Sequence, residues 1–128
     1  MSIENKSFTV DYEEFINNLE RYRGNHPACP LLQALLQSFE ILQGKWTFRV
    51  IFYLLKNEHM RFGELKKLIP TITNTMLTAT LKELEKNGIV SRIQYNEIPP
   101  HVEYSLTESG NALLPVFYDL AKWSSEHL

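Results

Sequence analysis

The fold of this chain is decided by residues 63–107, which have the sequence GELKKLIPTITNTMLTATLKELEKNGIVSRIQYNEIPPHVEYSLT. Up to Gly88 the apolar residues recur every three or four positions, a spacing typical of helices. Pro70 interrupts this pattern, so we predict one short helix over 63–69 and a second over 73–88. In the second helix, Leu77, Leu81 and Leu84 share one face and are expected to point inward.

Beyond Gly88 the apolar residues alternate, which indicates β-strands. We predict strands over 89–95 and 101–106, joined by a proline-containing turn at 96–100 into a hairpin. Two short helices with a break between them, followed at once by a hairpin, indicate a winged helix-turn-helix. In that arrangement the outer face of the second helix can enter the major groove of DNA.

Further helices are predicted on both sides of this unit. One starts at the capping pattern of residues 11–14 and ends near Gly24. Another follows Pro30, and residues 45–56 are apolar nearly all round, which predicts a helix buried on several sides. The last begins at Thr107 and is expected to bend at Pro115. The predicted fold class is mainly α with a small β-hairpin (α+β), a winged helix-turn-helix with N- and C-terminal dimerisation helices.

Length and composition indicate a single globular domain with an appended arm. The chain has 128 residues, of which 44% are hydrophobic and 22% charged, ordinary values for a folded protein. Its single cysteine, Cys29, excludes an internal disulfide framework and a zinc site built on several thiolates. The N-terminus lacks the pattern of a secretory signal, and no apolar run is long enough to span a bilayer. We therefore expect a cytoplasmic protein without a membrane partner.

The net charge of −2 hides an uneven distribution of charge along the chain. Residues 40–95 hold nine basic and five acidic side chains, a balance of +4, whereas residues 96–128 hold one basic and five acidic side chains, a balance of −4. A basic segment beside acidic ones is expected where one face meets a polyanion, although chance clustering is the alternative.

The exposed face of the helix over 73–88 supplies the candidate DNA contacts. Its first turns carry small or amide side chains suited to base edges, and positive side chains surround it. The alternative is a solvated helix start, where Asn and Thr are common. The expected base contacts are Asn74, Thr75, Thr78 and Ala79, and the expected phosphate contacts are Arg61, Lys66, Lys67, Lys82, Lys86, Arg92 and His101.

Several short motifs, in order along about 100 residues, resemble the HxlR-type bacterial winged-helix regulators. They are Cys29-Pro30, Gly44-Lys45-Trp46-Thr47, Arg61-Phe62-Gly63-Glu64-Leu65, Ile69-Pro70, Met76-Leu77-Thr78, Leu81-Lys82-Glu83-Leu84-Glu85, Gly88-Ile89-Val90, Pro99-Pro100-His101-Val102-Glu103-Tyr104-Ser105-Leu106-Thr107-Glu108 and Gly110. The resemblance implies a homodimeric transcription regulator that binds palindromic operator DNA. Thr73-Asn74 opens the second helix where the family often has Ser-Pro, so no operator sequence is transferred.

The two terminal helices are candidates for the dimer interface. The last helix carries more apolar surface than one core-facing stripe requires, and a two-fold axis would bury the excess. The alternative is that both helices pack only on their own domain. The chain is accordingly divided into an arm (1–28), a DNA-binding domain (29–107) and a C-terminal dimerisation helix (108–128). The expected interface residues are Phe15, Leu19, Tyr22, Leu114, Phe117, Tyr118 and Ala121.

Cys29 is a candidate redox-sensing residue because a helix N-terminus stabilises a thiolate. The resemblance implies that in some HxlR-type regulators a matching cysteine senses oxidants or electrophiles. An oxidant or small-molecule effector is therefore a candidate partner. The alternative is a small buried residue at a helix cap. His26 and Cys29 have metal-ligand spacing but no further ligands nearby in sequence, so no metal and no cofactor are expected.

Two other functions are alternatives to DNA binding. A winged-helix module that binds only another protein is the first, but it has little need of a basic central segment. An enzyme is the second, and the sequence has no phosphate-binding glycine loop and no pattern of catalytic side chains. We therefore expect a non-enzymatic regulator of transcription.

Overall fold

The computed structural model describes residues 12–17, 19 and 30–128. The chain divides into two compact units, Met1–Leu42 and Gln43–Leu128. The first contains helical residues 12–17, as expected, and helix α2 (Pro30–Leu42). The sequence predicts three segments, which are defined by their expected roles. The two compact units have other boundaries because they are defined by packing. Those roles therefore stay predictions.

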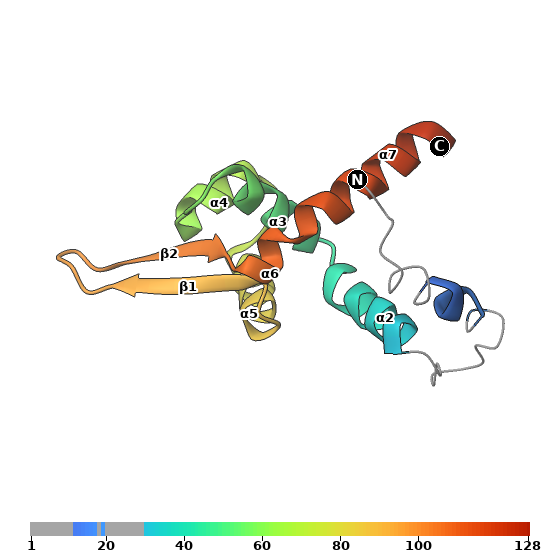
Figure 1. Ribbon diagram of the computed structural model, residues 1–128. Coiled ribbons are helices and arrows are strands. Elements are labelled where there is room, and N and C mark those ends of the chain that lie inside the picture. Colours follow the sequence, from blue (N-terminus) through green and yellow to red (C-terminus); the bar gives the residue numbers. More distant parts are fainter. Residues whose placement is uncertain (1–11, 18, 20–29) are drawn as a thin grey trace. The chain divides into compact units, whose positions relative to one another are not determined.

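The second unit contains the helix pair and the hairpin that the sequence predicts. β1 and β2 pair antiparallel, from Val90 opposite Leu106 to Tyr95 opposite His101. The hairpin and the last helix project in opposite directions from this unit (Figure 1). The predicted fold class is confirmed. The elements are α3 (Thr47–Lys56), α4 (Phe62–Leu68), α5 (Asn74–Lys86), β1 (Val90–Tyr95), β2 (His101–Leu106), α6 (Glu108–Asn111) and α7 (Leu113–His127).

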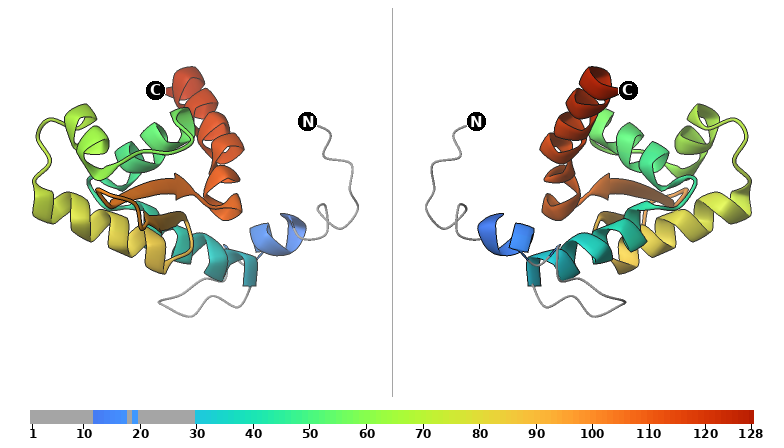
Figure 2. Two further views of the ribbon diagram at one scale, coloured as in Figure 1. Left: turned by 90° about the vertical axis from the view of Figure 1, so that its left-hand side faces the viewer. Right: turned by 90° about the vertical axis from the view of Figure 1, so that its right-hand side faces the viewer.

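The core of this unit forms around α3, which packs against α4, α5 and β2. As predicted, α5 buries Leu77, Leu81 and Leu84 almost completely. Each fully buried aliphatic side chain contributes about 1.5–3 kcal/mol relative to an exposed one. Figure 2 shows α4 and α5 joined at one edge of the unit, with α7 leaving from another side. The packing therefore fixes α5 by one face and leaves its opposite face in solvent.

Both ends of α5 are fixed by local contacts. At the start, the Thr73 hydroxyl accepts a hydrogen bond from the backbone N–H of Met76 at 3.1 Å. At the end, Gly88 has φ of +73°, in the left-handed region that glycine adopts without strain. Ile89 N–H then donates to the Leu84 carbonyl at 2.9 Å, which closes a Schellman motif. This stop directs the chain from α5 straight into β1.

Thr107 connects the hairpin to the helix that follows it. Its hydroxyl donates to the Gly88 carbonyl and accepts from the Gly110 N–H at 3.1 Å. Gly110 is buried, and a Cβ there would collide with the Ile89 carbonyl and the Leu106 side chain. The end of α5, the base of the hairpin and α6 are therefore held together closely.

Two expectations about helices need correction. First, α3 packs against three elements but keeps one side in solvent, where Phe48 and Phe52 are 49% and 42% exposed. Second, the last helix is two helices, broken at Ala112 rather than bent at Pro115. Pro115 has no N–H for the Asn111 carbonyl and its ring crowds that residue, so the helix restarts with proline in its first turn. The first short helix also begins one residue earlier than predicted, at Phe62.

No residue of α7 is buried. Phe117 lies edge-on to Phe48 with ring centroids 5.1 Å apart and is half-buried. Leu120 and Trp123, one and two turns further along, are more than half exposed. None of the described helices has the length and apolar character needed to cross a membrane.

Candidate nucleic-acid interface

The candidate base contacts lie together at the exposed start of α5. Asn74, Thr75, Thr78 and Ala79 are all exposed. Because the buried leucines hold the opposite face, these side chains cannot turn inward without breaking the core. Small and amide side chains at the start of an exposed helix can approach base edges in a major groove.

The expected phosphate contacts surround this surface on three elements. Lys67 on α4, Lys82 and Lys86 on α5, and Arg92 on β1 are exposed, and Lys66 is half-buried. In the parts of the chain that the structure describes, none of these cations has an ion pair with a carboxylate. Their positive charges are therefore not paired at close range, and they are available to phosphates.

Arg61 stands directly before α4. Its backbone N–H donates to the Glu64 carboxylate at 2.7 Å, an interaction that fixes the first turn of α4. Arg61 is exposed and directly precedes α4, the first helix of the α4–α5 pair. Its position is compatible with the predicted phosphate contact.

A groove of about 280 Å³ runs between α5 and the hairpin. Thr78, Lys82 and Glu85 line it from α5, and Arg92 and Tyr104 line it from the strands. The Thr78 hydroxyl and the cations Lys82 and Arg92 suit a phosphodiester group, whose oxygens accept hydrogen bonds and carry negative charge. Glu85 adds a negative charge to the same groove and opposes that attraction.

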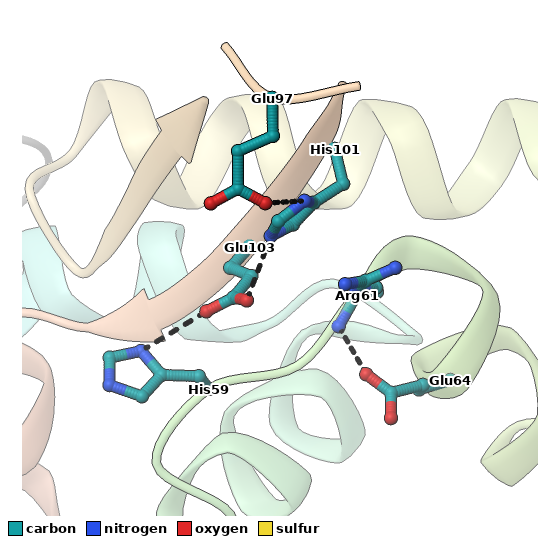
Figure 3. A network of polar contacts seen from close by, with 6 residues as sticks. All are labelled: His59, Arg61, Glu64, Glu97, His101 and Glu103. Carbon is teal, nitrogen blue, oxygen red and sulfur yellow. Dashed lines mark hydrogen bonds and ion pairs between the residues drawn. The ribbon is translucent and has the colours of Figure 1, made fainter. Parts of the chain in front are cut away.

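His101, also an expected phosphate contact, has polar partners within its own unit. Its Nε2 lies 3.1 Å from Glu103 Oε2 and its Nδ1 lies 3.6 Å from Glu97 Oε2. Figure 3 shows these two contacts of the imidazole with the carboxylates. The imidazole also stacks on Tyr95, with centroids 4.7 Å apart, and only 16% of its side chain is exposed. Because carboxylates occupy both ring nitrogens, His101 is left out of the phosphate-binding surface.

Three residues at this surface are not among the DNA contacts that the sequence predicts. Met76 lies in the first turn of α5 and is 45% exposed, although methionine is usually counted with the core. Glu85 and Tyr104 line the groove. The helical period places Glu85 on the flank of α5, but only the fold shows that this flank faces the hairpin.

The predicted dimer residues fall in both units. Phe15 is half-buried and Leu19 exposed in the first unit, while Leu114, Tyr118 and Ala121 are exposed on α7. Tyr22 and Cys29 lie outside the described residues. Within the described ranges, no group of three or more His, Cys, Asp or Glu side chains is arranged to hold a metal ion.

A helix-turn-helix family model matches residues 41–128, which is more than half of the chain and includes all of α3–α7. The chain belongs to the HxlR-like helix-turn-helix family. The match covers both the exposed α5 surface and the hairpin. Members of this family are transcriptional regulators and not enzymes, so the chain is a transcriptional regulator of the helix-turn-helix type.

Named relatives agree with this assignment. The chain is 49% identical over 84 residues to an uncharacterised regulator, YkvN of Bacillus subtilis, covering 66% of this chain and 70% of that protein. The reduced form of the regulator YodB from B. subtilis is 37% identical, with a TM-score of 0.68 over 77% of this chain and 93% of that one. The redox regulator HypR in its oxidised form is 36% identical, with a TM-score of 0.65 over 74% and 97%.

Proposed function

We propose that this regulator binds palindromic operator DNA as a homodimer, with α5 in the major groove and the β1–β2 hairpin against the backbone or in the minor groove. The observation that carries the proposal is the exposed α5 surface, where four small or amide side chains are surrounded by unpaired cations. Since chromosomal DNA is its ligand, the protein works in the cytoplasm.

The residues divide into two roles on the DNA. Asn74, Thr75, Thr78 and Ala79 contact base edges, and the neighbouring cations contact phosphates on both sides. In the groove beside α5, Lys82 and Arg92 hold one strand of the backbone between the helix and the hairpin. Such phosphate contacts give affinity for any duplex, whereas the base contacts select a sequence.

The second copy of the chain packs on α7. Leu114, Tyr118, Leu120 and Trp123 are each more than half exposed on this one helix. Large apolar side chains exposed around one helix are typical of a protein interface, and a two-fold axis would bury part of this apolar surface against the same helix of the second copy. The resulting dimer sets two copies of α5 about 34 Å apart, or a multiple of that distance, to match successive half-sites.

Oxidation or modification of Cys29 changes operator binding in this proposal. The chain has one thiol, so its products are a disulfide between subunits, a mixed disulfide or a sulfenic acid. The similarity to HypR, a redox regulator, supports this part. Cys29→Ser should abolish any response of operator binding to an oxidant, whereas an unchanged response in that variant would remove Cys29 from the mechanism.

Selection of bound sequences from random duplex DNA tests the proposal directly. The selected sites should be inverted repeats, and binding should weaken steeply as salt rises because phosphate contacts release counterions. Omitting and adding an oxidant during the selection tests the thiol response in parallel. Enrichment of no sequence, together with no binding to random duplex at low salt, would refute DNA binding.

A further inference from the structure

A chain of polar contacts connects the hairpin to the body of the second unit. His59, in the connection between α3 and α4, lies with its Nδ1 4.0 Å from Glu103 Oε1 on β2. The other oxygen of Glu103 lies 3.1 Å from His101 Nε2, and His101 Nδ1 lies 3.6 Å from Glu97 in the turn (Figure 3). Glu103 is therefore the one side chain of this chain of contacts that meets both the body and the hairpin.

The backbone supports the same junction. Met60 N–H donates to the Tyr104 carbonyl at 2.9 Å, and Tyr104 N–H donates to the Met60 carbonyl at 2.7 Å. Met60 and Tyr104 directly follow His59 and Glu103 in sequence. The bridge fixes the base of the hairpin, whereas the side-chain contacts extend through His101 and Glu97 toward its tip.

We propose that Glu103 is a positioning residue that sets the direction of the hairpin relative to α5, and that protonation of His59 and His101 strengthens its hold. The inference rests on the proposed function, since the hairpin's direction matters for its contact with DNA. An imidazolium forms an ion pair with a carboxylate, whereas a neutral imidazole keeps at most a hydrogen bond. Histidine changes charge between pH 5 and 8, so the hairpin is held more firmly toward the acid end of that range.

The surroundings of the two histidines give this effect its sign. His101 faces the carboxylates of Glu97 and Glu103 and the ring of Tyr95. His59 faces Glu103. Arg61 and Glu64, which Figure 3 also shows, interact with each other through the Arg61 backbone N–H. The groups in contact with the imidazoles are thus two carboxylates and a neutral ring, and a carboxylate attracts a positive imidazole more strongly than a neutral one.

A measurement without DNA tests whether Glu103 restrains the hairpin. In ¹⁵N relaxation experiments on the full-length protein, the amides of β1 and β2 should be less mobile at pH 6 than at pH 8. Glu103→Gln should remove this difference by making the hairpin mobile at both values. His101→Arg keeps a permanent cation beside the carboxylates and should leave the hairpin restrained at both values. Glu108→Gln, at the start of α6, is the matched control and should behave as wild type.

Binding to duplexes of two lengths tests whether this restraint of the hairpin affects DNA binding. The longer duplex extends far enough to contact the hairpin. The shorter duplex ends directly after the half-sites read by α5 and does not reach the hairpin. The measured quantity is the affinity for the longer duplex divided by the affinity for the shorter one. This ratio should be about two- to fivefold greater at pH 6 than at pH 8, since partly exposed ion pairs contribute only a small free energy. In Glu103→Gln the ratio should be equal at both pH values.

The outcomes separate this inference from the proposed function. A hairpin whose mobility ignores pH in the wild type, or depends on pH equally in Glu103→Gln, overturns the positioning role of Glu103 whatever the DNA results. Failure of the wild type to bind either duplex overturns the proposed function while the relaxation data still decide the positioning role.

Discussion

Helices α5 and α7 have similar lengths, 13 and 15 residues, but opposite relations to the core. α5 buries Leu77, Leu81 and Leu84 and exposes small, amide and cationic side chains. α7 buries no residue and exposes Leu114, Tyr118 and other large apolar side chains. In the proposed function, α5 binds a polar, negatively charged ligand and α7 binds an apolar protein surface.

The largest expected effect compares one leucine from each helix. Leu77→Ala leaves a cavity in the core and should lower the free energy of unfolding by about 2–5 kcal/mol at every protein concentration. Leu114→Ala should cost less, and its cost should depend on protein concentration because it acts on the dimer. Urea unfolding over a concentration series measures both. Equal losses that ignore concentration would show that α7 packs on its own chain.

Tyr118→Ala tests the α7 patch alone. Removing a large aromatic side chain from a dimer interface costs about 2 kcal/mol where that side chain is a hot spot, so the dissociation constant of the dimer should rise about thirtyfold. Analytical ultracentrifugation gives this constant. Lys122→Ala, on the same helix, should leave it nearly unchanged. A dimer as strong in Tyr118→Ala as in the wild type would place the interface elsewhere.

Asn74→Ala tests base contact by α5. The variant should lose about 1–3 kcal/mol of discrimination at one base pair of each half-site while binding random duplex almost normally. Affinities for the selected operator and for single-base variants measure this loss, with Asn111→Ala on α6 as the control. A uniform loss on specific and random DNA alike would remove Asn74 from the base-reading residues.

Lys82→Gln should have the smallest effect and the most diagnostic one. Loss of a single phosphate contact weakens binding to all sequences and lowers the salt dependence of affinity by about one unit on a log–log plot. Fluorescence anisotropy at several salt concentrations measures the slope. Lys122→Gln removes the same charge from α7 and should leave the slope as it was; an equal change in both would mean that net charge alone is responsible.

Much of this unit could be predicted from local sequence signals. The cap at Thr73, the stop at Gly88 and the change of period after it give α5 and both strands nearly to the residue. Phe48 shows where such signals fail. Its position in an apolar run predicts burial, but whether a neighbouring element covers it depends on contacts with residues far away in the sequence.

The candidate site also has features that the sequence predicts and features that only the fold shows. The exposure of Asn74, Thr75 and Thr78 follows from the helical period, because the leucines of α5 occupy the opposite face. His101 shows the limit of reasoning from charge along the chain. Its two carboxylate partners are near in sequence, yet the strand geometry decides that both ring nitrogens face them.

By itself, the sequence determined the winged helix-turn-helix, the polar outer face of α5 and the basic character of the segment around it. These properties depend on residue spacing and charge, which act over a few positions of the chain. The tertiary structure alone decided that α7 buries none of its residues, that a groove lies between parts of α5 and the hairpin, and that Glu103 joins the hairpin to the body. The physical reason is that periodicity shows a helix to have an apolar or polar face, whereas only the packing of distant segments decides what that face meets.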